Sequence, residues 1–66
     1  MNIAEKLEKM RDSYGIKKAV VARALGISSQ AYYKKINGGD RFNHEQLEAF
    51  AELLGYELEL IKKFEI

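Results

Sequence analysis

The sequence predicts an all-helical fold, with four helices followed by a short C-terminal β-strand. Three observations support this prediction. Apolar residues recur at helical spacing through most of the chain, glycines separate the apolar segments, and the apolar residues of positions 56–66 alternate with a strand-like period. The 66 residues are enough for one domain, and the absence of cysteine excludes a disulfide or a thiolate metal site that would stabilise it.

The first helix is predicted between Asn2 and Tyr14. Asn2 and Glu5 have the spacing of a capping box, in which each side chain accepts a hydrogen bond from the backbone N–H of the other residue. The apolar residues that would share one helical face are Ile3, Leu7, Met10 and Tyr14. Gly15 would end this helix, because glycine readily adopts the left-handed conformation that follows many helix ends.

Two shorter helices are predicted at about residues 17–25 and 28–37, joined by the short connection Gly26-Ile27. Lys17 is a poor N-cap for the first of them, whereas Ser28 has the side chain of a good N-cap for the second. The side chains expected to face the core are Val21, Ala22, Leu25, Ala31, Tyr32 and Ile36.

The fourth helix has the clearest start signal in the chain. Asn43 and Gln46 form a second capping box, and Phe42 and Leu47 stand at the two positions of a hydrophobic staple. The apolar stripe of this helix consists of Leu47, Phe50, Ala51 and Leu54. Gly55 would end the helix.

Residues 56–66 follow the helical domain of residues 1–55 and change its period, because apolar residues at 56, 58 and 60 alternate with glutamates. The alternation predicts one β-strand, which must pair with a short N-terminal segment or with the same strand of another copy, since a lone strand is not stable in water. The second pairing would give a two-fold dimer, whose expected contact residues are Leu58, Leu60, Phe64 and Ile66. The alternative is a short amphipathic helix, whose apolar residues would be Leu60, Ile61 and Phe64.

Charge is distributed unevenly, although the formal net charge is only +1. Residues 17–41 contain six basic side chains against Asp40 alone, which gives +5, whereas residues 42–66 contain six glutamates against Lys62 and Lys63, which gives −4. A basic middle segment is typical of a protein whose partner is a polyanion. The same pattern also fits charges scattered over a solvated surface.

The central stretch KAVVARALGISSQAYYKKINGG, residues 18–39, has the features of two short helices joined by a tight turn. Ala22 is small enough for the two helices to approach each other closely. Gly26, four residues later, permits the turn at little conformational cost. Tyr32 falls where an apolar residue should wedge into the angle between the helices.

Three elements of the sequence are similar to those of one known family. They are Ala22-x-x-Leu25-Gly26-Ile27-Ser28, the helix end at Asn37-Gly38, and the closing Leu53-Leu54-Gly55. On these elements the chain, from Asn2 to about Gly55, resembles the Cro/CI-type, lambda repressor-like helix-turn-helix family. Three residues depart from the pattern usual in the family. Lys18 stands where the family usually has glutamine, and Tyr32 stands where it usually has a β-branched residue or leucine. Lys35 occupies a position often held by an apolar residue.

The resemblance implies that the third helix enters the major groove of double-stranded DNA, while the preceding helix lies across the backbone. The residues implied to contact bases are Ser28, Ser29, Gln30, Tyr33 and Lys34. The residues implied to contact phosphates are Lys17, Lys18, Asn37 and Arg41. Simpler explanations stand beside these, because Gln30 and Lys34 are also ordinary solvent-facing helix residues and Ser28 is better explained as an N-cap.

The function implied by the resemblance is that of a transcriptional regulator, a phage or mobile-element Cro-like repressor that binds a palindromic operator as a homodimer. The alternative is a helix-turn-helix module for protein contact, such as an antitoxin or antirepressor partner. An enzyme is not expected, because the single histidine, His44, lies in the first turn of a helix and the chain has no thiol nucleophile. We expect no cofactor, no metal and no small-molecule ligand.

The N-terminal segment is studded with charges, so we expect no signal peptide. No apolar run approaches the roughly 20 residues that a membrane-spanning helix needs. The expected location is the cytoplasm of a bacterial or phage-infected host cell.

Overall fold

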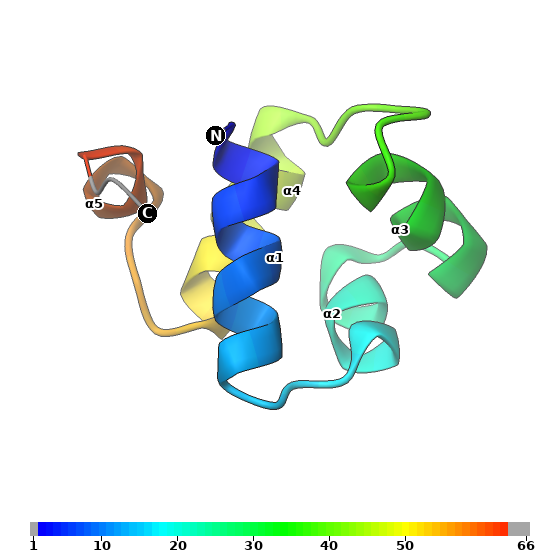
Figure 1. Cartoon of the computed structure of the whole chain (residues 1–66), viewed down its shortest axis with the longest axis horizontal. Helices are drawn as coiled ribbons and strands as arrows, with labels where there is room; N and C mark the ends of the chain where they lie inside the picture. The colour runs from blue at the N-terminus through cyan, green and yellow to red at the C-terminus, as the bar shows by residue number, and fades with distance from the viewer. Residues whose placement is uncertain (1, 64–66) are drawn as a thin grey trace.

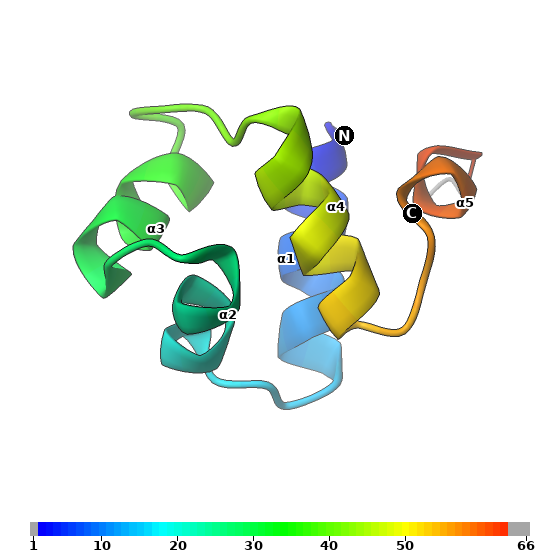
Figure 2. The same ribbon diagram turned by 180° about the vertical axis from the view of Figure 1, so that it is seen from behind.

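A computed structural model describes residues 2–63 of the chain. In chain order its helices are α1 (Ile3–Ser13), α2 (Lys18–Leu25), α3 (Ser29–Ile36), α4 (His44–Leu53) and α5 (Leu58–Lys63). In Figure 1, α2 and α3 lie on one side of α1 and α5 lies on the other, and Figure 2 shows α4 in front of α1 when the molecule is seen from behind. The predicted order of four helices before Gly55 is therefore confirmed. Among the described helices none is long and apolar enough to cross a membrane.

The predicted residues begin each of the first four helices. Asn43 and Gln46 form the complete capping box, with N···O distances of 2.8 and 3.0 Å. The Asn2 side chain accepts from the Glu5 N–H at 2.9 Å, but the Glu5 carboxylate bonds to the side-chain amide of Asn2 at 3.2 Å. The start of α1 therefore has a side-chain N-cap with a different second bond from the one expected. At α2 the N-cap is Lys17, which offers no side-chain acceptor.

The turn between α2 and α3 depends on Gly26, whose φ of 73° is in the left-handed region. This conformation lets the N–H of Ile27 donate to the carbonyl of Ala22 at 3.0 Å, which closes the end of α2. The next residue, Ser28, already caps α3, because its hydroxyl accepts from the N–H of Ala31 at 3.0 Å. Only Gly26 and Ile27 separate the end of α2 from the N-cap of α3. The conformation of Gly26 and the two capping hydrogen bonds therefore largely fix the direction in which α3 leaves α2.

The core lies where α4 packs against α1, α2 and α5. Its buried apolar residues are Leu7, Val21, Ala22, Tyr32, Phe50, Ala51, Leu54, Leu58 and Ile61. At its centre the rings of Tyr32, Phe42 and Phe50 form a triangle, with each pair of centroids 6.0 Å apart. Tyr32 is completely buried, which confirms its prediction as a core residue.

The predicted C-terminal strand is wrong for residues 56–63. No strand occurs among residues 2–63, and Leu58 to Lys63 form helix α5 instead. The reason is spacing: Leu58 and Ile61, three residues apart, are both buried against α1 and α4, whereas Leu60 is 43% exposed. A strand would have placed Leu58 and Leu60 on one face and Ile61 on the other. The alternative of a short amphipathic helix is the correct one, and Phe64 and Ile66 lie outside the described residues.

Tyr14 also differs from its prediction. It was expected on the inward face of the first helix, but it lies one residue beyond α1 and is 48% exposed. Its ring stacks on that of Tyr56, with centroids 6.5 Å apart, and the two hydroxyl oxygens are 2.7 Å apart. The pair joins the end of α1 to the segment between α4 and α5.

Candidate nucleic-acid interface

The outer face of α3 carries exposed polar side chains. The exposed residues on this helix and at its cap are Ser28, Ser29, Gln30, Tyr33 and Lys34. They include every residue that the sequence led us to expect at DNA bases. Tyr33 and Lys34 follow Gln30 by three and four residues, so both lie on the same face of the helix as Gln30. The hydroxyl of Ser28 is engaged as the N-cap of α3, which leaves it only partly free for a ligand.

Four residues expected at phosphates lie on elements next to α3 in the chain. Lys17 and Lys18 lie at the start of α2, Asn37 is the C-cap of α3, and Arg41 lies in the segment before α4. All except Lys18 are exposed. The first turn of α2 contains no acidic residue, so its helix dipole and two lysines together form a positive end beside α3. An anion would be bound favourably at this end.

Two predicted contact residues of different kinds are joined across α2 and α3. The ammonium of Lys18 lies 4.8 Å from the centroid of the Tyr33 ring. This is a cation–π distance, and the attraction holds the exposed ring of Tyr33 beside the start of α2. The structure thus brings Lys18 and Tyr33 together, a pairing that the sequence did not predict.

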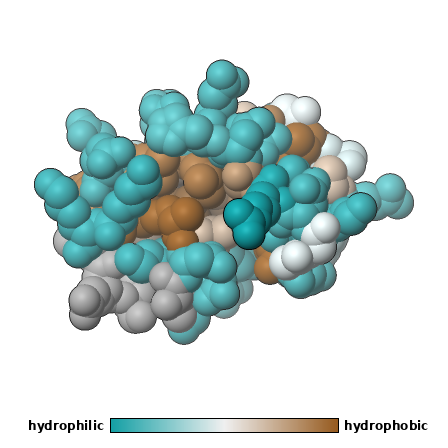
Figure 3. Space-filling model, turned by 90° about the horizontal axis from the view of Figure 1, so that it is seen from above, coloured by the Kyte–Doolittle hydropathy of each residue, from teal (hydrophilic) through white to brown (hydrophobic). Residues whose placement is uncertain are grey.

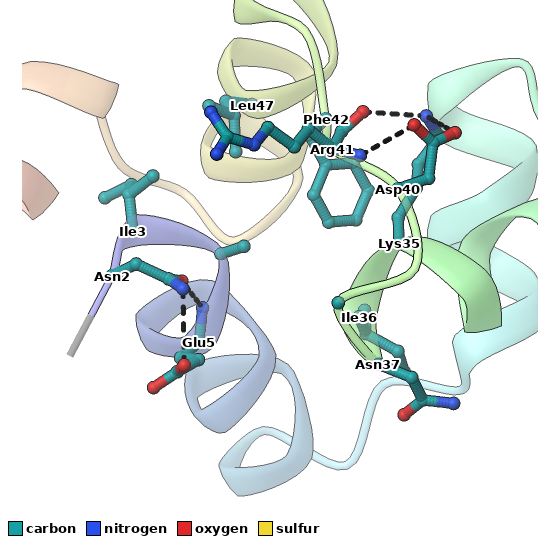
Figure 4. A pocket seen from close by; sticks show the side chains of 12 residues that line it. Asn2, Ile3, Glu5, Lys35, Ile36, Asn37, Asp40, Arg41, Phe42 and Leu47 are labelled. Carbon is teal, nitrogen blue, oxygen red and sulfur yellow. Dashed lines mark hydrogen bonds and ion pairs between the residues drawn. The ribbon is translucent and has the colours of Figure 1, made fainter.

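The segment between α3 and α4 is held by Lys35. Its ammonium donates to Asp40 Oδ2 at 3.1 Å and to the carbonyl oxygen of Arg41 at 2.9 Å, and it lies 5.9 Å from the centroid of the Phe42 ring. Figure 4 shows these groups meeting beside Phe42. The backbone N–H of Arg41 and then Lys35 lower the pKa of Asp40, because both stabilise its charged form. Lys35, which departs from the family pattern, therefore positions the segment that carries Arg41.

Gly39 brings the same segment close to α3. A β-carbon at this position would lie 3.1 Å from Cγ of Lys34, which is tighter than most real contacts. The absence of a side chain at Gly39 therefore lets the chain pass over the stem of Lys34. The sequence predicted Gly39 only as part of a helix end, and this contact with a predicted base-contacting residue was missed.

Behind α3, Tyr32 takes part in a polar network with two residues of α1. Its hydroxyl donates to Glu8 Oε1 at 2.6 Å, and Arg11 donates to both oxygens of Glu8 at 2.7 and 2.9 Å. Arg11 also donates to the carbonyl of Ile16. The sequence predicted Tyr32 as a core residue but missed its partners. A tyrosine where an aliphatic residue is usual was the available signal, because a buried hydroxyl needs a hydrogen-bond partner.

The protonation states of this network follow from its contacts. Burial opposes the charged form of Glu8, but hydrogen bonds from Arg11 and Tyr32 outweigh it, and the net effect lowers the pKa of this carboxyl. Burial and then the hydrogen bond to Glu8 raise the pKa of the Tyr32 hydroxyl well above its usual value. At neutral pH the network therefore contains a carboxylate, a guanidinium and a neutral phenol that donates its proton.

A family comparison identifies the arrangement of α2 and α3. The family model described as Helix-turn-helix matches residues 7–61, most of the chain. The chain belongs to the lambda repressor/Cro-like helix-turn-helix family. The resemblance inferred from the sequence is therefore confirmed, and this is a family of DNA-binding regulators. The search of curated proteins found no match, and neither did the search of solved structures.

This helix-turn-helix domain is electrostatically polarised. The exposed acidic residues of α4, of α5 and of the segment between them are Glu45, Glu48, Glu52, Glu57 and Glu59. The predicted phosphate contacts lie instead on α2 and on the segments at the end of α3 and before α4. His44 is exposed beside Glu48, with 3.3 Å between the nearest nitrogen and oxygen, and the described residues contain no cluster of three or more potential metal ligands. The polarity favours approach to a polyanion with α2 and α3 leading.

The helix-turn-helix domain also has a groove of about 590 Å³ at the end where α1 begins. Its apolar lining includes Ile3, Ile36, Phe42 and Leu47. Figure 3 shows apolar surface on this end of the molecule, bordered by hydrophilic side chains. The expected hydrophobic staple residues, Phe42 and Leu47, are both half-buried here against the core.

Proposed function

We propose that the protein is a sequence-specific regulator of transcription that binds double-stranded DNA through α3. The observation that carries this proposal is the exposed polar face of α3, flanked by basic residues of α2 and of the segment before α4. Such a face fits the major groove, where side chains distinguish base pairs by hydrogen bonding. Membership of the helix-turn-helix family supports the same conclusion.

The residues fall into two groups by chemistry. Gln30 can bond in a bidentate manner to adenine, and Lys34 can donate to the acceptors of guanine. The phosphate contacts are proposed for Lys17, Lys18, Asn37 and Arg41, which fix the position of the domain on the duplex. Ser28, Ser29 and Tyr33 complete the base-contacting group.

We further propose that the protein acts as a Cro-like repressor, of phage or mobile-element origin, and binds a palindromic operator as a homodimer. The proposed dimer contact lies in the C-terminal segment, in which Leu58–Lys63 form α5. Leu60 supports this, because it is a large apolar residue exposed on α5. Leu58, in contrast, is buried within its own chain and is not available to a partner without unfolding.

Selection from a library of random duplexes at two salt concentrations tests the proposed function. We expect enrichment of a palindrome whose half-sites are about 34 Å apart, with affinity that falls steeply as salt rises because counterions are released. Failure to retain any duplex at low salt would contradict DNA binding and favour a protein partner. Enrichment of single half-sites would contradict the homodimer alone.

Single substitutions separate base contacts from phosphate contacts. Gln30→Ala is expected to cost about 1–3 kcal/mol on the selected operator and to relax the preference at one base position. Arg41→Ala is expected to weaken binding to all sequences alike and to reduce the salt slope by about 1. Lys9→Ala is the control for loss of a positive charge, because Lys9 is exposed on α1 and belongs to neither contact group nor to the proposed dimerisation segment. Equal loss on all sequences for Gln30→Ala would contradict its role at bases.

A further inference from the structure

We propose that Glu8 is a positioning residue for DNA recognition, one that sets the orientation of α3 although it lies on α1. This inference rests on the proposed function. The carboxylate of Glu8 is linked to three helices: to Arg11 of its own helix, to Tyr32 of α3, and electrostatically to Lys18 of α2.

The link to α3 is directional. The Tyr32 hydroxyl donates to Glu8 Oε1 at 2.6 Å, across 24 positions of the sequence. Hydrogen bonds to a charged acceptor are short and geometrically demanding, whereas apolar packing of a wedge residue tolerates small rotations. Because Tyr32 is completely buried, the bond holds α3 at one rotation about its own axis and at one height along α1.

The next residue of α3 extends the link to the surface. Tyr33 follows Tyr32 and is 47% exposed, with its ring beneath the ammonium of Lys18. The positive charge of Lys18 adds a smaller contribution to the hydrogen bonds from Arg11 and Tyr32 that lower the pKa of Glu8 against the effect of burial. A rotation of α3 would therefore disturb both the buried bond of Tyr32 and the exposed contact of Tyr33.

Stability alone does not account for this network. Buried ion pairs contribute little net stability, and well-packed apolar residues of similar volume often stabilise a protein at least as much. Orientation is a different requirement, because recognition groups must be held within about 0.5 Å of their productive position. Gln30 and Lys34 lie on the same short helix as Tyr32, so the restraint on Tyr32 is also a restraint on them.

The test compares Glu8→Gln and Tyr32→Phe with the wild-type chain on the selected operator and on an unrelated duplex. Both variants keep the shape of the side chain and remove the charge or the hydroxyl. We expect operator affinity to fall about tenfold, with affinity for the unrelated duplex unchanged or slightly raised. Measurements are made at a temperature where circular dichroism shows each variant to be fully folded.

The sign of the effect excludes a simple charge explanation. Loss of a negative charge near the interface would by itself raise affinity for every duplex. The matched control is Glu52→Gln, an exposed carboxylate on α4 that loses the same charge. A fall on the operator alone, seen in Glu8→Gln but not in Glu52→Gln, is therefore the expected signature of orientation.

The outcomes are distinguishable. If the wild-type chain binds its operator and both folded variants keep the same ratio of operator to unrelated affinity, Glu8 only stabilises the fold and the inference is wrong. If the wild-type chain binds no duplex, the proposed function fails and this inference fails with it. A lowered ratio in Tyr32→Phe, which keeps the Glu8 charge, supports the inference even if Glu8→Gln does not fold.

Discussion

Replacement of Arg11 by alanine is expected to lower the free energy of unfolding by about 3 kcal/mol. The guanidinium is nearly buried, with a side chain 8% exposed, and it donates to both oxygens of Glu8 and to the carbonyl of Ile16. Removal of one partner from a buried pair costs about 3–5 kcal/mol, because the other charge stays buried without compensation. Glu8 is 25% exposed, so water screens part of this cost and the lower end of that range applies.

The loss is large relative to the whole stability of so small a domain. Folded domains are stabilised by about 0.05–0.15 kcal/mol per residue, which gives about 3–10 kcal/mol for this chain length. Urea unfolding followed by far-ultraviolet circular dichroism measures the change. Arg11→Lys is expected to be intermediate, because an ammonium keeps the charge but cannot form the bidentate pair. Arg23→Ala, exposed on α2, is the control and should change stability by less than about 0.5 kcal/mol.

An Arg11→Ala variant with the unfolding midpoint of the wild-type chain would contradict this account. It would mean that water replaces the guanidinium at Glu8 without penalty. This result would leave the proposed positioning role of Glu8 undecided, because the hydrogen bond from Tyr32 to Glu8 does not involve Arg11.

Local chemistry explains why the sequence predicted most of the helix boundaries. The capping box of Asn43 and Gln46 involves residues three apart, and the turn at Gly26 depends on the conformational freedom of one residue. Such signals do not require knowledge of which helices meet. The exposed face of α3 was predicted for the same reason, because the side of a helix that lacks apolar residues follows from periodicity.

Tertiary contacts explain what the sequence did not predict. The partner of the Tyr32 hydroxyl lies 24 positions away, and no spacing rule connects these residues. The contacts of Lys35 with Asp40 and Arg41 depend on how the chain leaves α3. The strand prediction for residues 56–63 was wrong for a related reason. A short apolar segment fits both a helical and a strand period, and the burial of Ile61 decides between them.

Ile61→Ala is expected to destabilise the fold by about 2–5 kcal/mol, as large-to-small changes at buried aliphatic residues do. Ile61 is completely buried in the core that α5 forms with α1 and α4. A loss of this size is a large fraction of the total stability of so small a domain. Thermal unfolding followed by circular dichroism measures the change, and a variant as stable as the wild-type chain would contradict the packing of α5.

Leu60→Ala is the matched control, because the neighbouring leucine is 43% exposed on the same helix. Its substitution is expected to change the stability of the single chain by less than about 0.5 kcal/mol. If this segment were a strand, Leu60→Ala would cost more stability than Ile61→Ala. Leu60 would then share the buried face of Leu58, while Ile61 faced solvent. If sedimentation shows that Leu60→Ala weakens self-association without unfolding the chain, α5 has two separate faces. The Ile61 face would then complete the domain, and the Leu60 face would bind the second copy.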